Sequence, residues 1–177
     1  MKKTLLALML SLSSLAFADP VVFNMELGKT TEQEVKDMYE TTEDGVNRYS
    51  KGNQYFISPQ AIDIEDLNSL LVIFDEKGIL TAVISKFQET DNMNHKKFEH
   101  FFGILQSKYK LVKKQKPFVG DRYGKFRNGD TEILLEAPHM GGFQVNLIYE
   151  RKEFIEAYKK ISAEDKKSQK TNDSNML

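Results

Sequence analysis

The 177-residue sequence contains no cysteine and no tryptophan, and it has only four prolines. The absence of cysteine excludes disulfide bonds, thiolate metal ligands and lipid attachment through a lipobox cysteine. No stretch after residue 18 approaches the roughly 20 consecutive apolar residues that a membrane-spanning helix requires. The core therefore has to come from ordinary apolar side chains, and 12 phenylalanines are its bulkiest contributors.

Residues 1–18 have the pattern of a cleavable signal peptide. Two lysines follow Met1, Leu5–Leu15 forms a short apolar segment, and Ala16-Phe17-Ala18 places small residues at the two positions that signal peptidase reads. We expect cleavage before Asp19. Export of a cysteine-free chain favours the bacterial periplasm over an extracellular space where small domains usually carry disulfides, and release into the medium is the other outcome to consider.

Charge is distributed unevenly along the chain. Residues 19–92 carry 15 acidic and 6 basic side chains, whereas residues 93–177 carry 11 acidic and 17 basic ones. This asymmetry is typical either of two oppositely charged halves that pack together or of a basic end that faces an anionic surface. Because the mature chain is net acidic and exported, nucleic acid is not an expected partner.

Two segments have the pattern of a β-hairpin, in which two apolar, β-branched-rich runs flank a short polar turn. In both turns a glycine can take the positive φ that such a connection needs. The first hairpin joins Leu70–Phe74 to Ile79–Phe87 through Asp75-Glu76-Lys77-Gly78, and the second joins Tyr123–Phe126 to Thr131–Leu135 through Asn128-Gly129.

Periodicity predicts the remaining elements. Helices are expected at Thr31–Glu40, Lys97–Tyr109 and Arg151–Ile161, and further strands at residues 21–27, 46–49, 55–58 and 143–149. The second helix should carry one apolar stripe, formed by Phe98, Phe101, Phe102, Leu105 and Tyr109. The Thr31–Glu34 spacing is typical of a capping box, and Asn92 or Asn94 is suited to cap the second helix. The segment Pro117–Gly120 is expected to form a turn whose apolar residues enter the core.

These elements predict an α+β fold, with a mostly antiparallel sheet and helices packed on one face. Each half of the chain has a helix followed by strands, which suggests a tandem α-β-β-β pseudo-repeat. We expect one domain over residues 19–162, with sub-units of about 19–92 and 93–162. Residues 163–177 are polar and lysine-rich, a composition typical of a flexible tail.

Two short motifs also suggest a family resemblance. A glycine and a threonine precede a short helix in Gly28-x-Thr30-x-x-x-x-Val35, and Leu71-x-Ile73-Phe74-Asp75-x-x-Gly78-x-Leu80 follows. Together they resemble the small SmpA/OmlA-type outer-membrane assembly lipoproteins, and the tandem arrangement is similar to the β-lactamase-inhibitor-protein fold. Unlike those lipoproteins, this chain has no lipobox cysteine. The resemblance implies a fold and a periplasmic, protein-binding style of function, and it transfers no binding residue.

The sequence contains no recognisable catalytic or metal-binding motif, and nothing in it indicates a cofactor. His139, in a loop flanked by proline and glycine, is the histidine in the setting most typical of a site. Residues 108–127 form a basic region. The candidate ligand-binding side chains are therefore Lys113, Lys114, Lys116, Arg122, Lys125, Arg127 and His139.

Three functions follow from these observations. The first is a soluble periplasmic interaction protein, such as an inhibitor, assembly factor or envelope adaptor, that binds an envelope protein. The second is a binder of an anionic envelope component through the basic region. The third is a hydrolase that uses the His139 loop.

Overall fold

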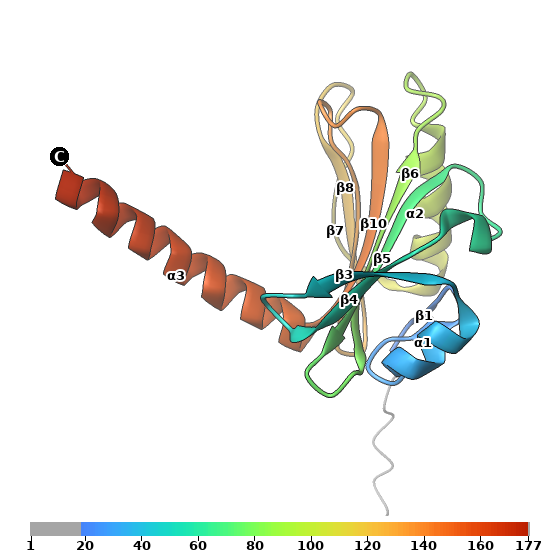
Figure 1. The fold of residues 1–177 in the computed structure, drawn as a ribbon. Coiled ribbons are helices and arrows are strands. Elements are labelled where there is room, and N and C mark those ends of the chain that lie inside the picture. Colours follow the sequence, from blue (N-terminus) through green and yellow to red (C-terminus); the bar gives the residue numbers. More distant parts are fainter. Residues whose placement is uncertain (1–18, 177) are drawn as a thin grey trace, which may run out of the picture.

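The computed structural model describes residues 19–176, so the predicted signal peptide lies outside the described residues. The fold is α+β and is built on an eight-stranded sheet in which every neighbouring pair is antiparallel (Figure 1). The strands lie in the order β3-β4-β5-β6-β10-β9-β8-β7. Their bounds are β3 Thr41–Val46, β4 Lys51–Ile57, β5 Leu67–Asp75, β6 Leu80–Gln88, β7 Lys110–Gln115, β8 Arg122–Asn128, β9 Thr131–Ala137 and β10 Gln144–Arg151.

Three α-helices and some smaller elements complete the described chain. The helices are α1 (Glu32–Met38), α2 (Lys96–Lys108) and α3 (Lys152–Met176), with a 3₁₀ turn at Pro59–Ala61 and a two-stranded ribbon of β1 (Val21–Val22) and β2 (Met25–Glu26). The predicted capping box is present. The Thr31 hydroxyl accepts from the Glu34 backbone N–H, and the Glu34 carboxylate accepts from the Thr31 N–H.

The chain consists of two similar units, each a helix followed by four strands that pair in sequence order. The prediction of three strands per unit is wrong by one strand in each. The units meet last strand to last strand, through the antiparallel pairing of β6 with β10. At the centre of this seam the buried Ser85 hydroxyl donates to the Leu147 carbonyl at 2.8 Å.

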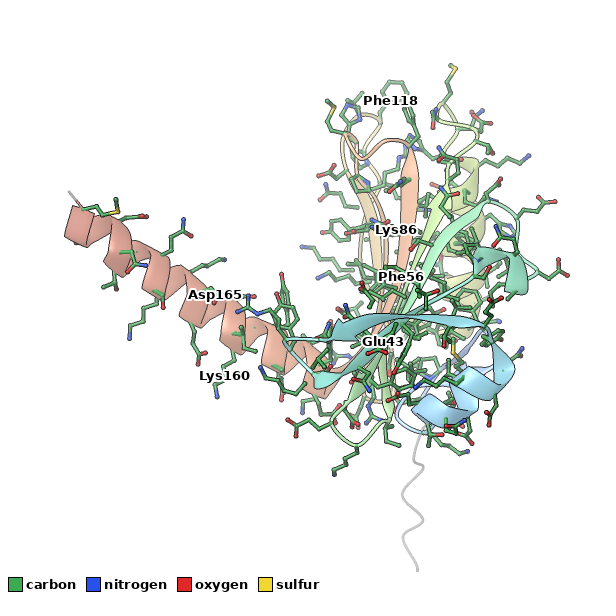
Figure 2. All side chains as sticks on the ribbon, in the orientation of Figure 1. Glu43, Phe56, Lys86, Phe118, Lys160 and Asp165 are labelled. Carbon is green, nitrogen blue, oxygen red and sulfur yellow. The ribbon has the colours of Figure 1, made fainter. Side chains whose placement is uncertain are left out.

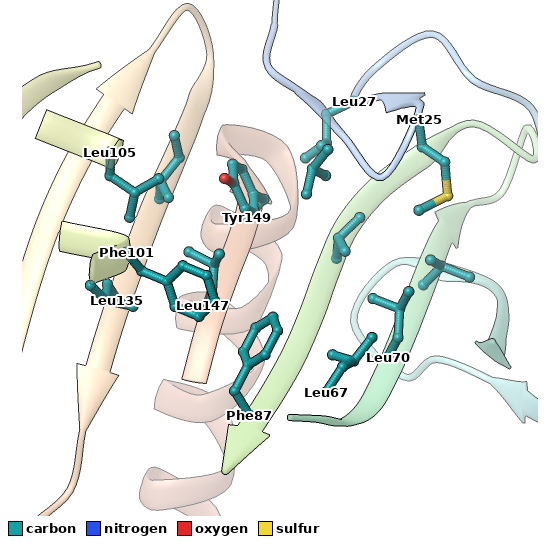
Figure 3. Packing of buried hydrophobic residues seen from close by; sticks show 14 of the residues in the cluster. Met25, Leu27, Leu67, Leu70, Phe87, Phe101, Leu105, Leu135, Leu147 and Tyr149 are labelled. Atoms are coloured by element: carbon teal, nitrogen blue, oxygen red, sulfur yellow. The ribbon is translucent and has the colours of Figure 1, made fainter. Parts of the chain in front are cut away.

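The main core lies between the sheet and α2. Phe98, Phe101, Phe102 and Leu105 form the predicted apolar stripe of α2, and all four are buried. Figure 3 shows Phe101 and Leu105 of α2 with Leu135, Leu147 and Phe87 of the sheet. Val35 of α1 belongs to the same buried cluster. We call this side of the sheet the covered face.

Both predicted hairpins are present as β5–β6 and β8–β9. Local details differ elsewhere. Residues 21–27 form a tight ribbon and not one strand, because Phe23 and Asn24 both adopt positive φ between β1 and β2. The strand predicted at residues 46–49 is wrong, because β3 ends at Val46 and residues 47–50 form the turn before β4. Residues 110–115, predicted only as a basic region, form edge strand β7.

The third helix differs most from prediction. It continues to Met176, although the sequence predicted that it ends near Ile161 and that a flexible tail follows from residue 163. Phe154 anchors its first turn against Ile73 and Ala82, on the sheet face opposite α2. Beyond this anchor the helix projects away from the sheet (Figure 1). From residue 163 onward its described side chains are exposed and mostly polar, and the helix former lysine occurs there three times.

Candidate binding surface

The second face of the sheet, which we call the open face, is covered only near the start of α3. Successive strand residues point to opposite faces, so the strand pairings identify which side chains lie here. Phe154 of α3 packs on Ile73 and Ala82, with Tyr49, Leu71 and Ile84 partly buried around it. The ring of Tyr49 makes edge contacts with Phe154 and Tyr158. The rest of the open face is not covered by any helix in residues 19–176.

One row of side chains crosses the open face along all eight strands. Each member is the direct cross-strand partner of the next. From β3 to β7 the row consists of Thr42, Phe56, Leu71, Ile84, Ile148, Leu134, Lys125 and Lys113. The five central members are apolar, and we call them the apolar row.

The apolar row is accessible to solvent. The Phe56 side chain is 40% exposed (Figure 2), and Leu71, Ile84, Ile148 and Leu134 are half-buried. With strands about 4.8 Å apart, five members span roughly 19 Å. A contiguous apolar stripe of this length on a polar surface is a feature of interaction sites, whereas single exposed apolar residues are ordinary.

Polar rows border the apolar row on both sides. On one side Lys86, Asn146, Glu136 and Tyr123 lie in cross-strand register, and the Asn146 amide donates to Glu136 at 3.0 Å. On the other side Glu150, Glu132 and Arg127 are in register, and Arg127 forms an ion pair with Glu132 at 2.8 Å.

The pKa of the Glu150 carboxyl is raised on this surface. Burial raises its pKa above the usual value of 4.5, and the nearby Glu132 carboxylate raises it further. The charges of Lys125 and Lys159 oppose this shift. A partly buried carboxyl beside the apolar row therefore gains a proton more readily than an exposed one.

The candidate basic residues divide between the two faces. Lys113, Lys125 and Arg127 lie on the open face, where the Lys113 ammonium lies 5.6 Å from the Tyr123 ring centroid. A shallow hollow of about 360 Å³ lies here, lined by Lys113, Asp121, Arg122, Tyr123, Lys125, Leu134, Glu136 and Pro138.

The other three predicted cations, Lys114, Lys116 and Arg122, have partners in α2. Lys116 and Arg122 form ion pairs with Glu99 at 2.6 and 3.2 Å. The Lys116 ammonium also lies 3.6 Å from the Phe102 ring centroid, and that of Lys114 lies 5.9 Å from it. The six predicted cations therefore do not all lie on one face, because alternate residues of a strand face opposite ways. Arg122 nevertheless lines the hollow near Lys113 and Lys125.

His139 lies in the loop between β9 and β10, at the end of the sheet. Its backbone N–H donates to the Asp121 carboxylate at 2.8 Å, and the residue is exposed. It lines an open hollow of about 450 Å³ together with His95, Glu89, Met93, Phe118 and Phe143. Phe118 is 95% exposed (Figure 2), so the prediction that the Pro117–Gly120 turn enters the core is wrong.

Searches of the described residues add two findings. No cluster of three or more His, Asp or Glu side chains able to hold a metal ion occurs in residues 19–176. Within the same part of the chain, none of the helices has the length and apolarity to cross a membrane. Comparison with known proteins found no matching family model, no matching curated protein and no matching solved structure.

Sequence reasoning missed the apolar row, although a signal was present. The runs Leu70–Phe74 and Leu80–Ile84 are apolar at almost every position, a pattern typical of strands that are buried on both faces. The structure covers one face with α2 and leaves part of the other open. An excess of apolar residues over what the helices can cover was therefore the available indication of a binding surface.

Proposed function

We propose that the chain is an exported interaction protein that binds another protein through the open face of its sheet. The observation that carries this proposal is the apolar row, five half-exposed apolar side chains in unbroken cross-strand register. A standard protein interface buries about 800 Å² on each partner, and its tightly bound centre is usually apolar. An eight-stranded face about 34 Å wide provides this area.

The charges at one end of the row specify the partner further. Lys125 and Lys113 continue the row beyond Leu134, and Arg127 lies beside them. A partner that inserts apolar side chains along the row and places a carboxylate beyond Leu134 would match this pattern. The tandem helix-and-sheet order supports the similarity to the β-lactamase-inhibitor-protein fold suggested by the sequence, and with it a protein-binding style of function.

Export is part of the proposal. It rests on the signal-peptide pattern of residues 1–18. Asp19, the expected first residue of the mature chain, is fixed by the second unit: its carboxylate accepts from the Thr131 hydroxyl at 2.9 Å and pairs with Arg151 at 3.2 Å. Mass spectrometry of periplasmic and medium fractions should find a protein that begins at Asp19. Retention of Met1 on the whole cellular pool would contradict export.

Binding is tested with immobilised chain from Asp19 onward and an envelope extract of the producing cells. The variant Phe56→Ser/Leu134→Ser removes two members of the apolar row. The control Ile64→Ser changes a side chain of almost equal exposure, 39% against 40% for Phe56, in the loop before β5. We expect a protein that binds wild type and control with equal affinity and binds the row variant at least about tenfold more weakly.

Saturable binding with purified partner, measured by calorimetry, completes this test. The proposal fails if no protein binds saturably, or if wild type, control and row variant retain the same proteins to the same extent. Thermal unfolding of each variant verifies that a loss of binding is not a loss of fold.

A second candidate function is binding of an anionic envelope component, and the grouping of Lys113, Lys125 and Arg127 beside a hollow favours it. Purified lipopolysaccharide is a suitable probe. Binding should weaken strongly as salt rises and should be lost in Lys125→Glu, while Lys114→Glu, on the covered face, serves as the control. Salt-independent binding, or equal loss in both variants, would exclude this site.

A further inference from the structure

The two outer strands of the sheet carry opposite charge. Strand β3 contains Glu43 and Asp44 (Figure 2 labels Glu43) and no basic residue, whereas β7 contains Lys110, Lys113 and Lys114 and no acidic residue. Nearly all residues of both strands are exposed. Within residues 19–176 no strand lies on the outer side of either one, so each leaves a row of backbone N–H and C=O groups unpaired.

The direction of these strands permits the sheet to continue from one molecule into the next. Because the sheet has eight strands and all neighbours are antiparallel, β3 and β7 run in opposite directions. A second copy placed beside the first in the same orientation would therefore bring its β3 antiparallel to β7. The covered faces of both copies would then lie on the same side.

The side-chain register agrees with this arrangement. Glu43 pairs with Tyr55 and Lys114 pairs with Gly124, both on the covered face, and Lys113 lies on the open face. Asp44 follows Glu43 and points to the open face, where its carboxylate accepts from the Gln54 amide at 2.7 Å. One antiparallel register that keeps the faces continuous places Glu43 opposite Lys114 and Asp44 opposite Lys113.

Pairing of two identical edges is disfavoured by the same charges. Two β7 strands would oppose lysine with lysine, and two β3 strands would oppose acid with acid, and like charges directly opposite each other destabilise a strand pair. Both edges also have an irregularity, between Glu43 and Val46 and between Leu111 and Lys113, which limits regular pairing to a few residues. Weak, charge-dependent association is therefore expected, and not irreversible aggregation.

We propose that the chain associates head to tail with further copies of itself, the acidic β3 edge of one molecule pairing with the basic β7 edge of the next. Such an interface is heterologous, so it forms open rows or closed rings and not a simple two-fold dimer. The open faces of successive copies would form one extended surface. The proposal is independent of what the open face binds.

Sedimentation velocity of the chain from Asp19 onward tests the proposal. At about 0.01 M salt, where the screening length is about 30 Å, the mean sedimentation coefficient should rise with protein concentration. At about 1 M salt, where that length is about 3 Å, it should return to the monomer value. The edge variants Glu43→Lys/Asp44→Lys and Lys113→Glu/Lys114→Glu should each remain monomeric at low salt.

Mixing the two edge variants provides the decisive measurement, because it restores an acidic edge opposite a basic one. The mixture should associate as the wild type does, a result that also shows both variants to be folded. The control Glu76→Lys/Lys77→Glu reverses two exposed charges in the β5–β6 turn and should associate normally. The proposal is overturned if wild type is monomeric at every concentration, if either edge variant alone still associates, or if the mixture does not.

Discussion

Glu89 shows how a single buried side chain organises the second unit. Its carboxylate accepts from the backbone N–H groups of Lys97 at 3.0 Å and Phe98 at 3.2 Å, and the residue is 5% exposed. It therefore caps α2 from eight positions earlier in the chain. The predicted N-caps of α2 are wrong. The Asn94 amide donates instead to the Asp91 carboxylate, and the N-cap position is occupied by His95, which has a φ of 51°.

Replacing Glu89 should be among the most destabilising changes of a polar residue. Glu89→Ala leaves the first N–H groups of α2 buried without an acceptor, so the free energy of unfolding should fall by roughly 1–3 kcal/mol. Urea denaturation followed by circular dichroism measures this change. Glu76→Ala, at an exposed turn position, should change it by less than about 0.5 kcal/mol. Equal effects of the two substitutions would refute the capping role.

Gly124 permits close packing between strand β8 and α2. A Cβ atom there would lie 2.7 Å from the Phe102 ring, so Gly124→Ala should lower the free energy of unfolding by roughly 1–3 kcal/mol. Gly103 lies in α2 with nothing within 4 Å of such a Cβ atom, and Gly103→Ala should instead raise it by roughly 0.5–1 kcal/mol. Thermal unfolding of the two variants distinguishes these opposite signs.

Glu150 should make stability depend on pH. Because its pKa is raised in the folded chain, the folded state binds a proton more tightly than the unfolded one, and stability falls as pH rises from about 4.5 through the folded pKa. Glu150→Gln should therefore be more stable than wild type at pH 7, with the difference shrinking below pH of about 4. Denaturation at several pH values measures this difference. A constant difference would contradict the pKa shift.

At the scale of elements, the sequence predicted structure well where local chemistry determines it. The Asn128-Gly129 turn, the capping box at Thr31 and the phenylalanine stripe of α2 all depend on residues within one or two turns of each other, and all are confirmed. Strand β7 could not be predicted in this way. Half of its residues are lysines and all but one are exposed, and it is a strand because β8 supplies its backbone partners.

The candidate binding surface was predictable only in part, for a related reason. The apolar row depends on the register of four strand pairs, and one of them, Ile84 with Ile148, joins the two units. No local pattern specifies that register. The sequence likewise placed Lys113 and Lys114 in one patch, whereas the pleat of β7 separates them onto opposite faces.

Helix α3 divides into an anchoring turn and an exposed extension. Arg48 pairs with Asp165 at 3.0 Å, but both side chains are more than half exposed, and such pairs contribute little. A chain that ends after Ser162 should therefore unfold within about 2 °C of the full chain. Phe154→Ala removes the buried anchor and should lower the free energy of unfolding by roughly 3–5 kcal/mol. Scanning calorimetry of the truncated chain and of Phe154→Ala measures both unfolding temperatures. A large fall in the unfolding temperature of the truncated chain would contradict this division.

At the scale of the whole molecule, the charge asymmetry of the sequence becomes a spatial one. The acidic first unit and the basic second unit lie on either side of the β6–β10 seam, and the two outermost strands, β3 and β7, carry charge of opposite sign. The two units therefore do not cover each other's charges. Part of this charge lies along the two outer edges, with two acidic residues in β3 and three lysines in β7.

The β6–β10 seam also has a consequence for how fast the protein folds. Every other pairing in the eight-stranded sheet joins strands that are consecutive in the chain, whereas Ser85 and Leu147 are 62 positions apart. Hairpins close within microseconds, but distant strands must first find each other at a large cost in chain entropy. The four consecutive strands of each unit should thus pair early. The rate-limiting step should be the pairing of β6 with β10, which joins the two units.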